Sequence, residues 1–284
     1  MVQDLLDSLE KTIPNEIINI KVHRGHVLQE LEDYFIANKV KNVRGMDIHI
    51  EMILPNGKPE AAEDNGGVLR DMLAEYWNSF YKERCDGNIS KVPQLRPAID
   101  AKRWTSIAVI ILIGYHSEGY FPAHLSPSFM KFAMGGQEPD RNDLIQDYLR
   151  YLHETESNLI NQALDDFQKV EGEDLIDFFD SHKHVTIPNE NNFCKLLASL
   201  AHKELLQESA YIAEIWRDKI NELDPGLPYL YQQKLEDLKP SFKKVFGSMK
   251  FEQPNNREFV SMMKRLVKEF TNSQMGRFLR FCTG

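Results

Sequence analysis

Apolar residues recur with a helical period along most of the chain. Between positions 68 and 80 they fall three or four residues apart, which places them on one face of a helix. The same spacing at 144–167 predicts one or two helices, and at 192–223 it predicts two. Shorter helical patterns occupy 4–11, 25–37, 230–238 and 259–270. The pattern therefore indicates a mainly α-helical protein.

The most apolar stretch, residues 104–113, has no polar face, so periodicity alone does not separate a buried helix from a strand. Its length, Ala108 and the following glycine favour a buried helix that stops at Gly114. A shorter helix is predicted behind Ser126-Pro127, a capping residue followed by proline, and is expected to end at Gly135-Gly136.

One strand interrupts the helical pattern. Residues 47–54 alternate polar and apolar side chains, and Pro55-Asn56-Gly57 follows as a turn. Another short extended segment is expected at 185–188. The predicted fold class is α+β, mainly α, with a few short strands.

Composition and charge are those of an ordinary soluble globular protein. The 284 residues are 42% apolar and 27% charged, and their number suits one large or two modest domains. No apolar run approaches the roughly 20 residues of a membrane span, and the first ten residues carry acids where a secretory signal would be basic. We therefore expect an intracellular protein, cytoplasmic or nuclear, without a membrane partner. The net charge of −9 argues against nucleic acid as a partner.

The charge is unevenly distributed. Residues 143–180 contain eleven acids and two bases, whereas residues 234–280 contain eleven bases and five acids. Such segments can mark surfaces that bind partners, but solvated helix faces that attract each other within the fold produce the same asymmetry.

Six short motifs occur in a fixed order along the chain. They are Asp64–Asp71 (DNGGVLRD), Ile113–Tyr115 (IGY), Leu125–Phe129 (LSPSF) with Met134–Gly136 (MGG), Asp143-Leu144 with Tyr148-Leu149, Val185–Asn191 (VTIPNEN) and Phe278–Gly284 (FLRFCTG). In this order they resemble the HECT domain of ubiquitin-protein ligases, especially the diverged copies in proteins similar to G2/M phase-specific ubiquitin ligase. The resemblance covers residues 45–284.

The resemblance implies a domain order. Residues 1–44 would form an N-terminal helical extension, and residues 45–225 a HECT-like N-terminal lobe with a shortened small subdomain near 160–222. Residues 226–284 would form a helical tail that ends in the start of a C-terminal lobe. In the family, the N-terminal lobe docks a ubiquitin-charged conjugating enzyme. A cysteine of the C-terminal lobe takes the ubiquitin as a thioester before a lysine receives it.

The chain departs from the family at this cysteine. The family's nucleophile stands in a TCFN context downstream of the last motif, and this sequence contains no such motif. Cys194 is expected to be buried in a helix, Cys85 to be exposed without a histidine partner, and Cys282 to lack any following residues that could shape a site. The chain resembles a ubiquitin-protein transferase, yet no catalytic residue is assigned and whether it is an enzyme stays open.

Four apolar residues form the candidate partner-binding site: Leu175, Ile176, Phe178 and Phe179, set among acids between 171 and 184. An apolar contact with a charged rim is typical of a protein interface, whereas the same spacing also describes the buried face of a helix. The first alternative predicts docking of a ubiquitin-conjugating enzyme or ubiquitin. A rival from another class is a non-catalytic interaction scaffold or decoy derived from a HECT domain.

Histidines at 116, 124, 182 and 184 predict no metal site, because no carboxylate or cysteine accompanies them at ligand spacing. The glycine motifs that cradle phosphates are also missing from the sequence. We therefore expect neither a metal nor another cofactor.

Overall fold

The computed structural model describes residues 17–60, 65–229, 231 and 257–270. It divides the chain into two units, Met1–Pro228 and Tyr229–Gly284. The sequence placed a domain boundary after residue 225. The helix expected at 4–11, most of the helix expected at 230–238, and the terminal run 277–284 fall outside the described residues.

The described part of the first unit is mainly α-helical with two small sheets, and the α+β, mainly α class is confirmed. Its elements, in chain order, are β1 (Ile17–His23), α2 (Val27–Ala37), β2 (Asp47–Ile53), α3 (Asn65–Arg84), β3 (Cys85–Asp86), β4 (Val92–Pro93), α4 (Ala101–Glu118), α5 (Pro127–Gly135), α6 (Arg141–Tyr151), α7 (Glu154–Asp165), the 3₁₀ turn η1 (Phe167–Lys169), α8 (Gly172–Ser181), α9 (Phe193–His202), the π-helical turn η2 (Lys203–Gln207) and α10 (Ala210–Leu223). The second unit contains α13 (Arg257–Lys268), where a helix was predicted at 259–270.

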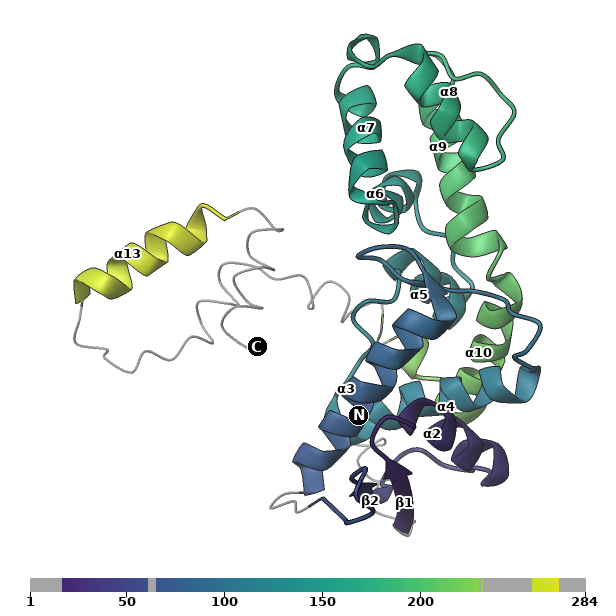
Figure 1. The fold of residues 1–284 in the computed structure, drawn as a ribbon, viewed down its shortest axis with the longest axis vertical. Helices are drawn as coiled ribbons and strands as arrows, with labels where there is room; N and C mark the ends of the chain where they lie inside the picture. The colour runs from purple at the N-terminus through teal and green to yellow at the C-terminus, as the bar shows by residue number, and fades with distance from the viewer. Residues whose placement is uncertain (1–16, 61–64, 230, 232–256, 271–284) are drawn as a thin grey trace, which may run out of the picture. The chain divides into compact units, whose positions relative to one another are not determined.

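Helices α6 to α9 lie at one end of the first unit, and β1, β2 and α2 lie at the other (Figure 1). Between them are α3, α5 and α10, and the chain from α9 through η2 into α10 connects the two ends. The candidate partner-binding residues on α8 therefore lie at the helical end, away from the larger sheet.

The larger sheet contains a strand that the sequence reading missed. β1 pairs in parallel with β2, with Ile18 opposite Ile48 and Val22 opposite Met52. Alternate residues of β1 are buried, and α2 packs against β1, α3 and α4. Residues 1–44 were expected to form an N-terminal helical extension, with short helical patterns separated by breaks, and β1 was not predicted in it. Its alternating pattern is present in the sequence, but no element was assigned to residues 17–23.

Helix α4 forms the centre of the core, which explains why it is apolar on every side. Residues from Ile107 to Ile113 are all at most 3% exposed, and α2, α3 and α10 pack around them. The helix does not stop at Gly114 as predicted, but ends at Gly119, whose φ of 60° closes a left-handed C-cap. A Cβ at Gly114 would come within 3.4 Å of Leu73, so this glycine allows α3 to approach closely.

The shorter helix begins and ends close to where its capping residues predicted. The Ser126 side chain accepts a hydrogen bond from the Phe129 backbone N–H, Pro127 is the first residue of α5, and Gly136 is the C-cap. The segment expected to be extended at 185–188 forms no strand and belongs to the irregular connection between α8 and α9.

Candidate partner-binding surface

Helix α8 carries the four residues that the sequence proposed as a partner-binding site. Leu175, Phe178 and Phe179 are at most 4% exposed, whereas Ile176 is 38% exposed. Positions i, i+3 and i+4 share one face of a helix, and the residue after i projects about 100° away from that face. Three of the four residues therefore form the buried face of α8 and are not accessible to a partner in this structure. This corrects the proposed contact set, of which only Ile176 remains exposed.

The buried face of α8 contacts the start of α9. It also contacts His182, the residue that follows α8. The Phe178 ring lies 4.7 Å from the His182 ring, and the Phe179 ring lies 6.2 Å from the Phe193 ring, measured between centroids. The His184 backbone N–H also donates to the Phe179 carbonyl at 2.8 Å. These contacts fix α8 and the connection that follows it as one hairpin with α9.

That connection adds two apolar side chains that the sequence reading did not include. Val185 is 94% exposed and Ile187 is 68% exposed, and together with Ile176 they place three β-branched apolar residues on the surface within twelve positions. The sequence contained a signal for this exposure, because residues 185–188 end in a proline and are followed by asparagines, a composition typical of surface loops. We call Ile176, Val185, Ile187 and the exposed acids of α8 the α8 surface.

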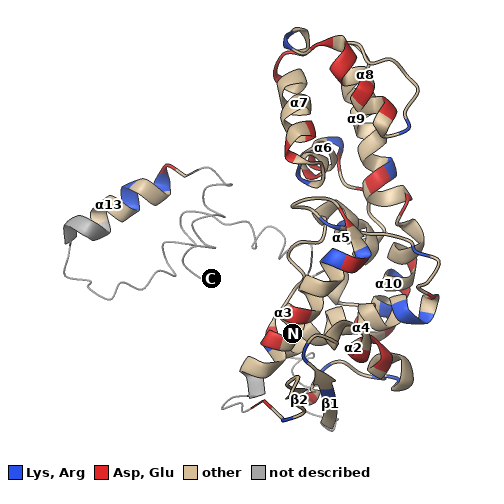
Figure 2. Cartoon of the chain, in the orientation of Figure 1, with Lys and Arg blue, Asp and Glu red and all other residues tan. Residues whose placement is uncertain are grey.

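The acids of the α8 surface are Glu173, Asp174, Asp177 and Asp180, all exposed. Figure 2 shows acidic residues along both α7 and α8. The exposed Lys183 follows these acids, so the charge of the stretch is mainly but not wholly negative. A partner with a basic rim would be attracted to it, and that attraction weakens as salt screens it.

The two described cysteines exchange the environments that the sequence predicted. Cys85 is buried, since it begins β3 opposite Pro93 of β4, and burial raises the pKa of its thiol well above the usual range. Cys194 is exposed, because it lies one position after Phe193, which belongs to the buried face of α9. Cys282 lies outside the described residues. Cys85 is therefore protonated and enclosed, which makes it unsuitable as a nucleophile.

Two of the four histidines pair with carboxylates rather than with one another. His116 Nε2 lies 2.8 Å from Asp224 Oδ2, and His182 Nδ1 lies 2.7 Å from Glu204 Oε1. Within the described ranges, no three His, Cys, Asp or Glu side chains are arranged to hold a metal ion.

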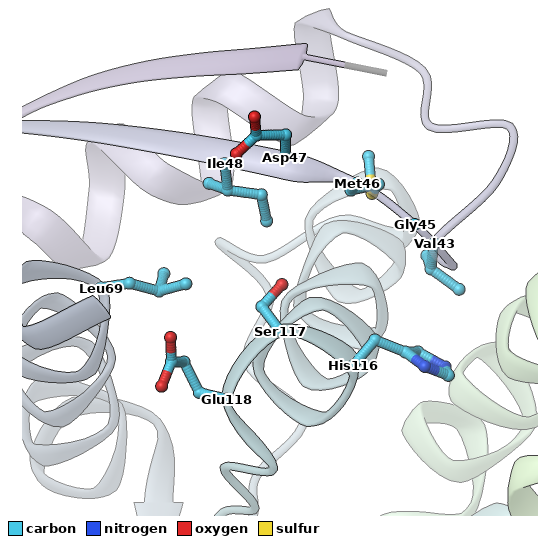
Figure 3. Close-up of a pocket in the computed structure, with 9 residues that line it drawn as sticks. All are labelled: Val43, Gly45, Met46, Asp47, Ile48, Leu69, His116, Ser117 and Glu118. Atoms are coloured by element: carbon cyan, nitrogen blue, oxygen red, sulfur yellow. The ribbon is translucent and has the colours of Figure 1, made fainter. Parts of the chain in front are cut away.

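An open pocket of about 330 Å³ lies between the start of β2, α3 and the end of α4 (Figure 3). Ser117 and Glu118 line it together with apolar side chains such as Leu69, while the His116 ring is turned away from it and bonds Asp224. Glu118 is already paired with Arg70, since their side chains are 2.6 Å apart. The lining residues contain no cysteine, lysine or arginine, and we assign no chemistry to the pocket.

Comparison with protein-family models gave no match for this sequence, and comparison with curated proteins gave none either. Among the described residues, no helix combines the length and the apolar composition needed to cross a membrane.

Proposed function

We propose that this chain contains a HECT-related N-terminal lobe that docks a ubiquitin-conjugating enzyme, alone or charged with ubiquitin, through the α8 surface. The observation that carries the proposal is the exposure of Ile176, Val185 and Ile187 in the same short stretch of chain as the four exposed acids of α8. They lie in the part of the chain where the resemblance implies the docking subdomain. A docking role of this kind belongs in the cytoplasm or nucleus.

The packing of the motif residues supports the proposal, because residues from separate motifs contribute to the same core. Phe129 on α5 and Tyr148 on α6 are fully buried. Asp147, beside the second of these, accepts hydrogen bonds from the Ser126 hydroxyl and the Ser128 backbone N–H. The motif residues Ser126 and Ser128 therefore also connect α5 to α6, through Asp147.

We propose further that the chain does not carry ubiquitin as a thioester. The step needs a thiolate that is both nucleophilic and a good leaving group. Cys85 is enclosed and its raised pKa keeps the thiol protonated. Cys282 and the exposed Cys194 stand outside any TCFN motif, because the sequence contains none. Docking without transfer is also what the scaffold or decoy alternative requires, so a thioester assay separates both from a complete ligase.

The docking proposal is tested by titrating the protein into a panel of fluorescently labelled conjugating enzymes, free and as stable ubiquitin conjugates, and recording anisotropy. We expect saturable binding to at least one member. The double variant Val185→Ser/Ile187→Ser should bind at least tenfold more weakly, because exposed apolar anchors dominate such interfaces. Raising the salt concentration should also weaken binding.

A matched control is Leu95→Ser, which removes an apolar side chain 51% exposed in the segment that follows β4. This variant should bind like the unaltered protein. Absence of saturable binding to every member of the panel, or equal weakening by Leu95→Ser, would count against docking through the α8 surface. A ubiquitin adduct on this chain that a thiol reductant removes would contradict the second part of the proposal.

A further inference from the structure

His182 lies at the junction of four elements and has a carboxylate at each ring nitrogen. It is the residue after α8, its Nδ1 lies 2.7 Å from Glu204 of η2, and its Nε2 lies 3.5 Å from Glu156 of α7. The Tyr148 hydroxyl of α6 donates to the other oxygen of Glu204 at 3.0 Å. One imidazole ring therefore connects α8 to α7 and η2, and through Glu204 to α6.

This geometry fits the charged form of the ring. A neutral imidazole carries one N–H and can donate to only one of the two carboxylates, while its other nitrogen would face the second carboxylate lone pair to lone pair. An imidazolium carries two N–H groups: one donates to Glu204, and the other, on the buried Nε2, faces Glu156 at 3.5 Å in an ion pair without a hydrogen bond. Glu204 is also 8% exposed, so an unpaired negative charge there would be costly.

The remaining groups around the ring do not replace its charge. Lys203 Nζ donates to the His182 backbone carbonyl at 3.3 Å and lies 3.9 Å from Glu208. The Tyr148 hydroxyl stays neutral, because burial and the neighbouring Glu204 raise its pKa far above the usual range. The exposed Asp180, on α8 itself, adds negative charge. A cation at the C-terminal end of α8 is also favoured by the helix dipole.

We propose that protonated His182 is a clamp that holds α8 to α7 and η2, and that loss of its proton loosens α8 and the connection carrying Val185 and Ile187. The clamp is a property of the protein alone. It rests on the proposed function only for its consequence, which is that binding at the α8 surface would depend on pH.

The direction of the pH effect follows from the neighbours of the ring. Burial lowers the pKa of His182, but the hydrogen bond and charge of Glu204, together with Glu156, outweigh burial and raise it above 6.5. The stabilisation is therefore complete below pH 6.5, the value for an exposed histidine, and is lost as pH rises through the raised pKa. Each unit by which this pKa exceeds 6.5 makes local opening of α8 about tenfold more frequent at high pH than at low pH.

The test combines two measurements on the full chain. The ¹⁵N shifts of the His182 ring, assigned by comparison with His182→Gln, should show both nitrogens protonated at pH 6.5 and a midpoint above that pH. Hydrogen exchange of residues 172–184, corrected for the intrinsic rate at each pH, should lose protection over the same range. Protection of α4 should stay constant, which separates local opening from global unfolding.

Two variants distinguish the clamp from a merely structural histidine. Glu156→Gln removes one carboxylate, so the midpoint of the ring and the loss of α8 protection should both move to lower pH. His202→Gln is the control, because His202 is on α9 and its nearest acid is the exposed Glu138 at 3.5 Å. This variant should leave both curves unchanged. A ring that is neutral at pH 6.5, or α8 protection that does not change with pH, would overturn the clamp whether or not a conjugating enzyme binds.

Discussion

Three carboxylates that are buried in the first unit bond to residues far away in the sequence. Glu32 accepts hydrogen bonds from Arg84, Arg103 and Tyr76; Asp147 from Ser90 and Ser126; and Asp224 from Arg44 and His116. An unpaired buried charge costs several kcal/mol, so these pairs specify how distant segments meet. Sequence patterns did not identify them, because the partners are separated by 21 to 180 positions.

Asp224 gives acid sensitivity to the first unit. Burial raises its pKa, but hydrogen bonds from His116 and Arg44 outweigh burial and lower the pKa from 3.8 to about 2. A lowered carboxylate pKa stabilises the fold above pH 3.8, and this stabilisation is lost as pH falls from 3.8 to about 2. We expect Asp224→Asn to reduce the difference in unfolding free energy between pH 5 and pH 2 by roughly 2 kcal/mol.

Urea unfolding at both pH values measures this difference. Glu222→Gln is a suitable control, since the Glu222 side chain is 65% exposed and pairs only with Lys219 on the same helix among the described contacts. If Asp224→Asn lost as much unfolding free energy between pH 5 and pH 2 as Glu222→Gln and the unaltered protein, the low pKa of Asp224 would be disproved.

Core and surface isoleucines should respond differently to truncation. Ile111 on α4 is 1% exposed, and Ile89 in the connection between β3 and β4 is 53% exposed. Ile111→Ala removes buried methylene groups and leaves a cavity, so it should cost about 2–5 kcal/mol of unfolding free energy. Ile89→Ala should change it by no more than about 0.5 kcal/mol. Equal effects of the two substitutions in chemical denaturation would show that α4 is not the centre of the core.

Single-residue environments were the least predictable feature. Cys194 follows a phenylalanine in an apolar helix and was expected to be buried, but it is one position off the buried face defined by Phe193, Leu197 and Leu200. Cys85 has charged neighbours on both sides and was expected to be exposed, but its pairing in β3 encloses it. In both cases the local composition suggested the wrong environment because helix phase or strand pairing decided it.

At the scale of elements, capping residues and hydrophobic period predicted most of the helices of the first unit. The start of α5 at Ser126-Pro127 and its end at Gly136 follow from local backbone chemistry, which the sequence displays directly. The end of α4 was predicted wrongly because Gly114 was interpreted as the residue that ends the helix. Gly114 instead lies within α4 and allows close packing against Leu73, and the helix ends at Gly119. β1 was missed although its residues alternate between exposed and buried, because the segment around it was interpreted as a helical extension.

Two helix caps of unequal importance provide a test at this scale. Asp100 caps α4 through one bond, to the Arg103 backbone N–H, and is exposed. Ser126 caps α5 and also donates to the buried Asp147. Asp100→Ala should therefore cost about 1 kcal/mol, whereas Ser126→Ala should cost about 1–3 kcal/mol more, because it also removes a donor from a buried carboxylate.

Paired urea denaturation curves compare the two substitutions. A Ser126→Ala protein that is no less stable than Asp100→Ala would mean that Asp147 is satisfied without this hydroxyl. Ser126→Thr, which keeps the hydroxyl, should recover most of the loss.

At the scale of the whole molecule, the sequence indicated where a surface of unusual charge would be but not which residues it would expose. The excess of acids at 143–180 was visible as composition, and in the structure most of them lie on α6, α7 and α8 (Figure 2). Which apolar side chains lie among these acids depends on how α8 packs against α9. That packing buries Phe179 and leaves Ile176 exposed.

The division of the chain after Pro228 predicts that the first unit folds alone. All three tryptophans, Trp77, Trp104 and Trp216, belong to this unit and are at most 1% exposed. Their fluorescence therefore reports its core and nothing else. A protein ending at Pro228 should show the same emission maximum as the full chain, and its urea midpoint should agree within the error of the measurement.

The comparison has a clear opposite outcome. A red-shifted emission maximum in the shortened protein, or a much lower urea midpoint, would mean that residues 229–284 complete the tryptophan core. In that case the unit boundary would not be a folding boundary. Because the shortened protein keeps the whole α8 surface, it should also bind a conjugating enzyme as the full chain does, so the same preparation shows whether docking needs only the first unit.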